Sequence, residues 1–303
     1  MPVRVIGIDA GGTKTVGLLA DGEGRVLAEA REGGANLHTH GELGVEKVID
    51  ALLERLTGGG RADALCLGIA GVDRPEDEAV VEGILRRLGY RERTRVVNDA
   101  IIALVAGAPE HYGIVVLAGT GSIAYGMDRA GRSSRSGGLG AILADEGSAY
   151  WLGSRALVAA VRAADGRGPA TGLGSLVLGA LGIASVSELV ALVYPAPGLP
   201  RHRVAALAPL VEQAAAGGDC VANELLDAAA RELALSGRAV VGRLSLSPPF
   251  PVVLAGGTFK ACPSLVTRVR RALDLAGAEV QLLSVEPAVG AVALALDAVR
   301  VAR

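Results

Sequence analysis

The sequence predicts an α/β protein built from two similar mixed sheets with helices on their faces. Two observations favour this class. First, an apolar strand, a turn of small residues and a second strand occur over residues 3–20 and again over residues 113–128. Second, the first half has the order of three strands, helix, strand, helix, strand and helix, which is typical of a sheet covered by helices. We interpret the repetition as a weak internal duplication.

Length and composition fit a folded chain of two domains. The chain has 303 residues, of which 50% are hydrophobic and 20% charged, so a disordered chain is excluded. We place the boundary near residue 115: residues 1–115 with a C-terminal helix over 288–303 form one domain, and residues 116–287 form the other. Two similar sheets joined by a hinge predict a ligand cleft at the domain interface.

Charge and cysteine usage exclude several classes of partner. The net charge of −2 gives no reason to expect a nucleic acid. No apolar run is long enough for a membrane span, and no signal-peptide pattern begins the chain. Cys66, Cys220 and Cys262 are odd in number and fit neither a disulfide framework nor a zinc spacing. We therefore expect a protein of the reducing cytoplasm.

In the first half of the chain, hydrophobic periodicity and turn residues predict the strands and helices. Short apolar runs predict strands, and apolar residues at helical spacing predict helices. Gly58–Gly60 ends the first helix, and Pro75 opens the second. The expected strands are 3–9, 16–20, 26–31, 64–70 and 95–99, and the expected helices are 42–56, 75–88 and 100–106.

The second half is predicted to be richer in helix. The segment Pro195–Pro200 is expected to be a rigid connection between two of the helices. The expected strands are 113–118, 123–128, 132–136, 252–255 and 280–283, and the expected helices are 146–164, 175–181, 187–192, 203–216, 220–244, 259–273 and 288–301.

Two glycine turns are candidates for phosphate contact. Asp9 ends the first strand, and Gly11-Gly12-Thr13-Lys14 follows it. Glycine leaves backbone N–H groups open to a phosphate, and an acid at the strand end can meet a metal or its water shell. The second turn is Gly119-Thr120-Gly121-Ser122. Neither matches a Walker A loop or a dinucleotide-binding fingerprint, so hairpins would hold the phosphate; the alternative is two ordinary turns.

Two acids follow strands or glycines and are candidates for chemistry. Asp99 closes an apolar strand just before a helix, which suits a catalytic base, although a helix N-cap is an equal alternative. Asp145 follows Gly138, Leu139 and Gly140, and glycine-rich backbone beside a carboxylate can hold sugar hydroxyls. Its alternative is also a cap, for the helix over 146–164.

Two further segments are less specific. Asn36 precedes His38 and His40, whose spacing of two could suggest a metal, but we do not expect a metal site there. Gly256-Gly257-Thr258-Phe259-Lys260 follows a strand and opens a helix. Such a turn can face a nucleotide, and a plain connection is the alternative.

These motifs together resemble the superfamily of acetate and sugar kinases, heat-shock chaperones and actin. Within it the chain is most similar to the BadF/BadG/BcrA/BcrD ATPase family and its N-acetylglucosamine kinase members. The likeness runs nearly end to end, and its most specific stretch is Ala144-Asp145-Glu146-Gly147-Ser148-Ala149-Tyr150-Trp151. It also includes the phosphate turns, Asn98-Asp99-Ala100 and Leu254-Ala255-Gly256-Gly257-Thr258. The resemblance implies two actin-like (ribonuclease H-like) domains.

The resemblance also implies a reaction: ATP-dependent phosphorylation of a hexosamine at its 6-hydroxyl. Asp99 would accept the hydroxyl proton, and Asp9 would position Mg²⁺ through water. ATP would contact Gly11, Gly12, Thr13, Lys14, Gly119, Thr120, Gly121, Gly256, Gly257 and Lys260. The sugar would contact Asn36, Asp99, Ser122, Gly138, Leu139, Gly140 and Asp145. Dimers are common among such kinases, so a homodimer is expected.

Departures from the family pattern leave alternatives open. Ile123 stands where sugar-kinase relatives often carry Asn, and Leu139 stands where they often carry an aromatic residue. Both changes touch the expected sugar pocket, so glucosamine, glucose and an N-acetylmuramic-type sugar stay open. An ATP-hydrolysing activator of 2-hydroxyacyl-CoA dehydratases or benzoyl-CoA reductases is the main rival, but none of the cysteines has its iron–sulfur setting. A DNA-binding sugar sensor would need an extension before the first strand.

Overall fold

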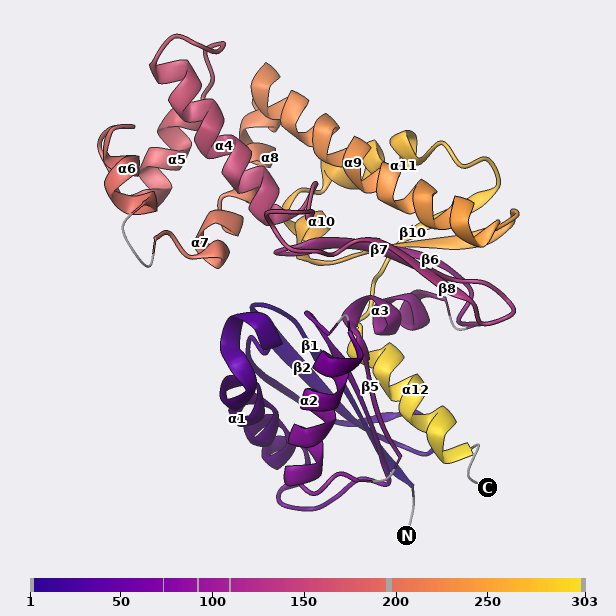
Figure 1. Cartoon of the computed structure of the whole chain (residues 1–303). Coiled ribbons are helices and arrows are strands. Elements are labelled where there is room, and N and C mark those ends of the chain that lie inside the picture. Colours follow the sequence, from indigo (N-terminus) through magenta and orange to yellow (C-terminus); the bar gives the residue numbers. More distant parts are fainter. Residues whose placement is uncertain (1–2, 73, 92, 109, 195–197, 301–303) are drawn as a thin grey trace. The chain divides into compact units, whose positions relative to one another are not determined.

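The computed structural model describes residues 3–72, 74–91, 93–108, 110–194 and 198–300, and it divides into two compact units. The first unit comprises Met1–Val115, Gly126–Arg132 and Leu283–Arg303, and the second comprises Val116–Tyr125 and Ser133–Leu282. Each unit contains one five-stranded sheet with flanking helices (Figure 1). The predicted α/β class with two mixed sheets is confirmed.

The sheet of the first unit has the strand order β3-β2-β1-β4-β5. β1 is antiparallel to β2 and parallel to β4, and β4 is parallel to β5. The carboxyl ends of β1, β4 and β5 therefore meet at one edge. The elements are β1 Arg4–Ala10, β2 Lys14–Asp21, β3 Val26–Gly33, α1 Leu37–Thr57, β4 Ala64–Ile69, α2 Pro75–Arg87, β5 Thr94–Asn98, α3 Asp99–Gly107 and α12 Ala288–Arg300.

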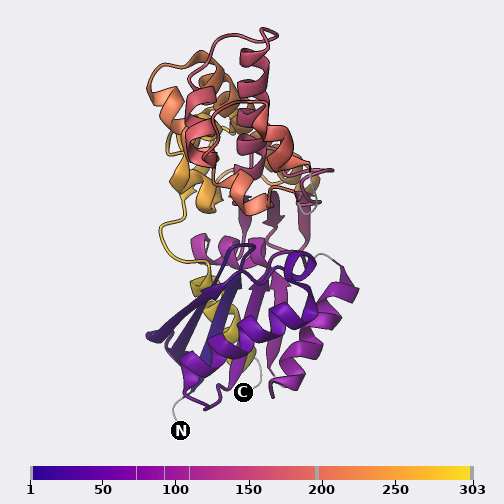
Figure 2. The same cartoon turned by 90° about the vertical axis from the view of Figure 1, so that its left-hand side faces the viewer.

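Helices cover both faces of this first sheet. α1 and α2 lie on one face and α12 on the other, as the two views show (Figures 1 and 2). Alternate residues of β1 supply both cores: Ile6 and Ile8 pack with α1 and α2, and Val5 packs with α3 and α12. The chain thus returns after residue 283 to complete the first unit.

Two glycines allow α12 to lie close to its neighbours. A Cβ on Gly7 of β1 would come within 2.4 Å of the backbone nitrogen of Val292. A Cβ on Gly290 would come within 2.0 Å of the carbonyl oxygen of Ile102 in α3. Both distances are far inside van der Waals contact, so only glycine permits this packing.

The sheet of the second unit repeats the topology of the first. Its order is β10-β9-β6-β7-β8, in which β6, β7, β8, β9 and β10 occupy the places of β1 to β5. The predicted duplication is therefore visible in the fold. The strands are β6 Gly113–Ala118, β7 Ser122–Met127, β8 Ser133–Gly137, β9 Phe250–Ala255 and β10 Ala278–Leu282.

The helices of the second unit lie mostly between β8 and β9. They are α4 Ala149–Ala164, α5 Leu173–Leu181, α6 Glu188–Val193, α7 Arg201–Ala205, α8 Ala208–Ala216 and α9 Cys220–Leu244, followed after β9 by α10 Gly257–Ala261 and α11 Ser264–Leu273. Two predicted helices are each split. Pro209 lies in the first turn of α8, and Pro263 separates α10 from α11, because proline lacks the N–H that a helix interior requires.

Two predicted helix starts are wrong. α1 begins at Leu37 rather than at residue 42, because Asn36 caps it and Gly41, with φ 66°, absorbs a kink. α4 begins at Ala149 rather than at residue 146, because Ser148 caps it. The predicted rigid connection includes residues 195–197, which lie outside the described residues.

Candidate active site

Two acids lie at the carboxyl edge of the first sheet. Asp9 is the penultimate residue of β1, and Asp99 follows the last residue of β5. β4 lies between these strands and is parallel to both, so their ends lie on the same edge. Ligands of α/β sheets bind beyond this edge.

The pKa of Asp9 reflects its burial and the charges around it. Burial raises its pKa to about 7, and the negative charges of Asp99 and, less strongly, Glu286 add to the shift, while Lys14 opposes it. The carboxyl groups of Asp9 and Asp99 are therefore close enough to repel each other. A site that gathers acids in this way favours a cation.

The alternative that Asp99 serves as a helix cap is wrong. The cap of α3 is Asn98, whose side-chain oxygen accepts a hydrogen bond of 3.0 Å from the backbone nitrogen of Ala100. Asp99 is instead the first residue of the helix.

The first glycine turn joins β1 and β2 through residues 11–13. The backbone nitrogen of Gly11 donates to the carbonyl oxygen of Lys14 at 2.9 Å, which closes the turn. Gly34 lies directly behind it: a Cβ there would come within 2.3 Å of the carbonyl oxygen of Gly12. Gly12 and Thr13 are exposed, so their backbone can meet a ligand.

Sequence reasoning missed the partner of Lys14. Its ammonium donates to Glu286 at 2.9 Å, and Glu286 also accepts from Arg31 at 3.2 Å. Burial alone would raise the pKa of Glu286, but the two cations outweigh it and lower that pKa. Glu286 lies 272 residues from Lys14, and no short-range pattern links them.

Asn36 lies beside the loop that follows β4. Its side-chain oxygen accepts from the backbone nitrogen of Thr39 at 3.1 Å, as an N-cap does. A Cβ on Gly71 would come within 2.9 Å of the Asn36 amide nitrogen and 3.0 Å of the His38 ring. The structure therefore brings Asn36 to the same sheet edge as Asp9, since this loop begins where β4 ends.

The second glycine turn joins β6 and β7 and has the same design as the first. The backbone nitrogen of Gly119 donates to the carbonyl oxygen of Gly121 at 2.8 Å. Gly256, with φ 108°, lies behind the turn, where a Cβ would come within 2.2 Å of the carbonyl oxygen of Ala118. The hydroxyl of Thr258 donates to the Gly119 carbonyl at 2.9 Å, which ties α10 to the turn.

Asp145 is buried beside this second turn. Its Oδ1 accepts from the backbone nitrogen of Ser122 at 3.2 Å, and its Oδ2 accepts from Arg201 at 2.9 Å. Burial raises its pKa, and these two donors oppose the shift. The alternative of a helix cap is wrong, because Ser148 performs that role. Asp145 also has a φ of 77°, an unusual conformation for a residue with a side chain.

The remaining expected residues are surface groups of the second unit. Gly138 and Gly140 have φ values of 74° and 87°, so the loop before Asp145 needs glycine at both positions. Leu139 is exposed on that loop, and Ile142 is 97% exposed. Gly257 and Lys260 are exposed in α10.

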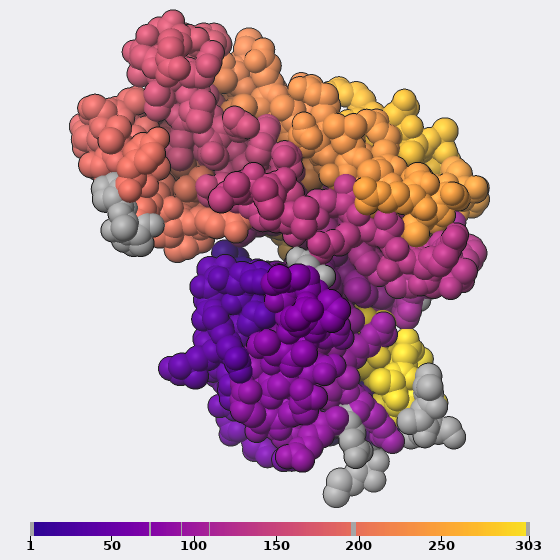
Figure 3. Space-filling view, in the orientation of Figure 1, coloured from indigo at the N-terminus to yellow at the C-terminus, as the bar shows by residue number. Residues whose placement is uncertain are grey.

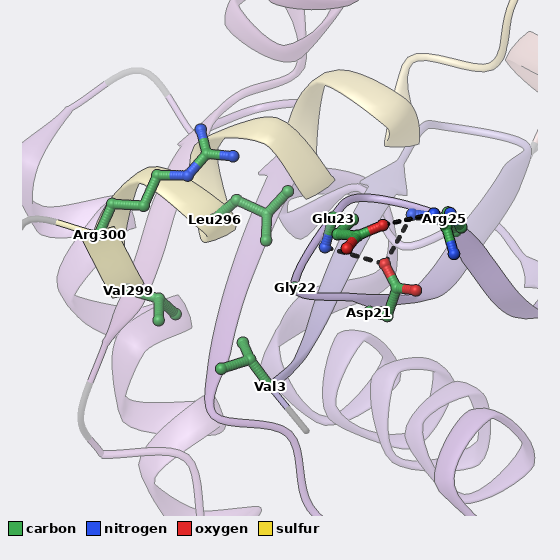
Figure 4. Close-up of a pocket in the computed structure, with 8 residues that line it drawn as sticks. All are labelled: Val3, Asp21, Gly22, Glu23, Arg25, Leu296, Val299 and Arg300. Atoms are coloured by element: carbon green, nitrogen blue, oxygen red, sulfur yellow. Dashed lines mark hydrogen bonds and ion pairs between the residues drawn. The ribbon is translucent and has the colours of Figure 1, made fainter. Parts of the chain in front are cut away.

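Two surface hollows lie elsewhere. One of about 360 Å³ is lined by Val3, the β2–β3 turn and the end of α12 (Figure 4). Another hollow, of about 740 Å³, is rich in arginine and has Arg61 and Arg93 among its lining residues. Val3 precedes β1 and Arg93 precedes β5, so both hollows lie at the amino ends of these strands, opposite Asp9 and Asp99.

Comparison with known proteins decides the family. The sequence pattern of the BadF/BadG/BcrA/BcrD ATPase family matches residues 6–295. This chain belongs to that family. The resemblance deduced from the motifs is therefore confirmed, and membership in an ATPase family implies the use of ATP.

Three relatives illustrate the place of this chain in the family. An N-acetylmuramic acid/N-acetylglucosamine kinase of Clostridium acetobutylicum is 39% identical and covers 96% of this chain and 97% of the relative. An N-acetyl-D-glucosamine kinase of Dictyostelium discoideum is 33% identical with the same coverage. The crystal structure of a putative N-acetylglucosamine kinase from Chromobacterium violaceum superposes with a TM-score of 0.76 at 27% identity, over 97% of this chain and 99% of that one.

Two acids of the first unit form a donor set of the kind that holds a magnesium ion. Asp9 and Asp99 place two mutually repelling carboxylates beside a glycine turn. Within the described ranges no three His, Cys, Asp or Glu side chains gather as a metal cage. Mg²⁺ suits such a site, because it is commonly bound by one or two carboxylates together with waters and substrate phosphates.

The two buried cysteines do not favour the iron–sulfur alternative. Cys66 and Cys262 are fully buried, and burial raises the pKa of each thiol to about 12. A cluster requires thiolates, which these surroundings oppose.

Within the part of the chain that the structure describes, no helix is both long and apolar enough to cross a membrane.

Proposed function

We propose that this chain is an ATP-dependent kinase that phosphorylates an amino sugar such as N-acetylglucosamine at its 6-hydroxyl. The observation that carries the proposal is the pair Asp9 and Asp99 at the edge of the first sheet, beside a phosphate-type glycine turn. The relatives named above support a sugar kinase, that is, a phosphotransferase acting on an alcohol.

Within this proposal the nucleotide is held mainly by backbone groups. The turns over Gly11–Lys14 and Gly119–Gly121 offer N–H groups to the phosphates, and Lys14 adds a positive charge. Gly256, Gly257 and Lys260 lie toward the adenosine. Mg²⁺ at Asp9, when bound, supplies positive charge that offsets the charge developing on the phosphates.

Asp99 is proposed as the general base. The sugar hydroxyl oxygen forms a bond to the γ-phosphorus, the bond between that phosphorus and the β–γ bridging oxygen breaks, and ADP leaves. The hydroxyl proton passes to the Asp99 carboxylate. Phosphoryl transfer depends on placement and charge more than on covalent chemistry, so one base and well-placed donors suffice.

The sugar is proposed to be held by a second set of groups. Asp145 accepts hydrogen bonds from sugar hydroxyls, since each of its oxygens keeps further lone-pair capacity beyond the bonds from Ser122 and Arg201. The loop glycines place backbone donors beside it. The other proposed contacts are Asn36, Ser122, Gly138, Leu139 and Gly140.

A coupled assay of ADP release tests the proposal. Purified protein is given ATP and Mg²⁺ with N-acetylglucosamine, N-acetylmuramic acid, glucosamine or glucose. We expect ADP release that depends on the sugar and is fastest with an N-acetylated amino sugar. ATP turnover that no sugar accelerates would contradict the proposal, and the iron content of anaerobically purified protein would then decide on the activator alternative.

A further inference from the structure

Arg201 is a group at the expected sugar site that the proposed roles do not use. It is the first residue of α7 and is exposed. Figure 3 draws the segment near residue 200 in salmon on the surface of the second unit. Its Nη2 donates to Asp145 Oδ2 at 2.9 Å. Any ligand that reaches the Asp145 carboxylate therefore also meets the Arg201 guanidinium.

The guanidinium is held in place and keeps unused donors. Its carbon lies 5.2 Å from the centroid of the Tyr150 ring, so the ring supports one face. The Arg201 side chain is 47% exposed, whereas that of Asp145 is 6% exposed. A guanidinium has five N–H donors, and among the described residues Asp145 supplies the one hydrogen-bond acceptor for them.

The charges around Arg201 have both signs. Asp145 neutralises it directly, and Glu146 adds a negative charge that acts on Asp145. His202 and Arg203 follow it on α7, are exposed, and the helix carries no acid. No acid on α7 therefore competes with a ligand for the Arg201 guanidinium.

We propose that Arg201 recognises a carboxylate on the acceptor sugar, so that the site takes amino sugars with a lactyl-type acid substituent as well as neutral ones. This inference rests on the proposed function. An arginine with free edge donors matches the planar geometry of a carboxylate, which can accept two parallel N–H···O bonds. Asp145 would hold hydroxyls common to both sugars, and Arg201 would meet the group that distinguishes them.

The test compares three acceptors and four proteins. The acceptors are N-acetylglucosamine, N-acetylmuramic acid and the methyl ester of N-acetylmuramic acid, which keeps the bulk and removes the charge. The proteins are wild type, Arg201→Met, Arg201→Lys and Arg203→Met. Arg203→Met is the matched control, since it removes the same charge from the same helix without touching Asp145.

We expect wild type to prefer the free acid over its ester by about tenfold in kcat/KM, since an arginine–carboxylate hydrogen bond contributes a factor of that order. Arg201→Met should abolish this preference and lower kcat/KM for the acid far more than for N-acetylglucosamine. Arg201→Lys should keep part of the preference, and Arg203→Met should keep all of it.

Two results would overturn the inference while the proposed function stands. One is phosphorylation of N-acetylglucosamine by wild type with no preference for the acid over the ester. The other is an equal loss on all three acceptors in Arg201→Met, because Arg201 would then act only by holding Asp145. Failure of every sugar to stimulate ADP release would instead remove the proposed function itself.

Discussion

The two sheets share one strand order but differ in the segment that connects the third strand to the fourth. After β3 the first unit has a single helix, α1, before β4. After β8 the second unit has the six helices α4 to α9 within the described residues before β9. Each sheet nevertheless keeps a glycine turn between its first two strands, closed by one backbone hydrogen bond and backed by another glycine.

This difference separates two kinds of requirement. The repeated scaffold supplies the glycine turns, which suit a phosphate common to many reactions. The segment between β8 and β9, which is much longer than the corresponding segment with α1 in the first unit, supplies Asp145 and Arg201. We infer that the shared part contacts ATP and that the added part determines which acceptor is used.

The largest expected effect concerns Asp99. This acid directly follows the fifth strand of the first sheet, and the fifth strand of the second sheet is directly followed by no such acid. Asp99→Asn should lower kcat by about 10³-fold, with the KM values for ATP and sugar changed far less, because a general base acts in the transition state. Steady-state kinetics on both substrates measure this. Asp50→Asn, at an exposed position on α1, is the control and should match wild type. A mutant with undiminished kcat would remove Asp99 from the chemistry.

The next effect compares the two glycines behind the turns. Gly34→Ala and Gly256→Ala should each lower the free energy of unfolding by about 3 kcal/mol, because the added Cβ would overlap a backbone oxygen. Gly256→Ala should be the worse by about 1 kcal/mol, since its φ of 108° also strains alanine. Urea unfolding measures both values.

The neighbouring glycines serve as controls for these substitutions. Gly33 and Gly257 have open space where a Cβ would lie. Gly33→Ala and Gly257→Ala should therefore leave the free energy of unfolding within about 1 kcal/mol of wild type. Equal losses at all four positions would show that close packing behind the turns is not the cause.

A smaller effect is the pH dependence that Asp9 gives the first unit. Because burial raises its pKa to about 7, the folded chain keeps a proton that the unfolded chain releases near pH 4. The free energy of unfolding should therefore fall as the pH rises from about 4 to about 7, and level off above that. Thermal unfolding in metal-free buffer tests this, and Asp9→Asn should show a flatter profile over the same range.

The smallest effect concerns the lysine that the first turn has and the second lacks. Glu286→Gln removes the carboxylate that neutralises Lys14, so the ammonium should attract phosphates more strongly. We expect the Kd for ATP to fall about threefold in Glu286→Gln, because a partly exposed ion pair contributes a free energy of that order. Lys14→Met should raise the Kd. Calorimetry at low and high salt measures both. A weaker affinity in Glu286→Gln would mean that Glu286 positions Lys14 instead.

Local patterns predicted the scaffold well. The glycine turns, the strands that lead to Asp9 and Asp99, and the helix over residues 220–244 follow from short-range chemistry, and the structure contains all of them. The predicted strand ends were each off by one residue, because β1 continues to Ala10 and β5 stops at Asn98. The helix caps were less predictable, because several neighbouring residues are equally able to cap a helix. Asn98 and Ser148 cap their helices, and Asp99 and Asp145 do not. Glu286 and Arg201 were missed, since their partners are 272 and 56 residues away.

The identity of the phosphorylated product tests the central claim most directly. Protein, ATP, Mg²⁺ and N-acetylglucosamine are incubated, and the products are examined by ¹H–³¹P correlation NMR. We expect a sugar phosphorylated at its 6-oxygen, formed in equal amount with ADP. ADP accompanied by inorganic phosphate and unchanged sugar would contradict the proposed kinase, because the chain would then hydrolyse ATP without transferring the phosphoryl group.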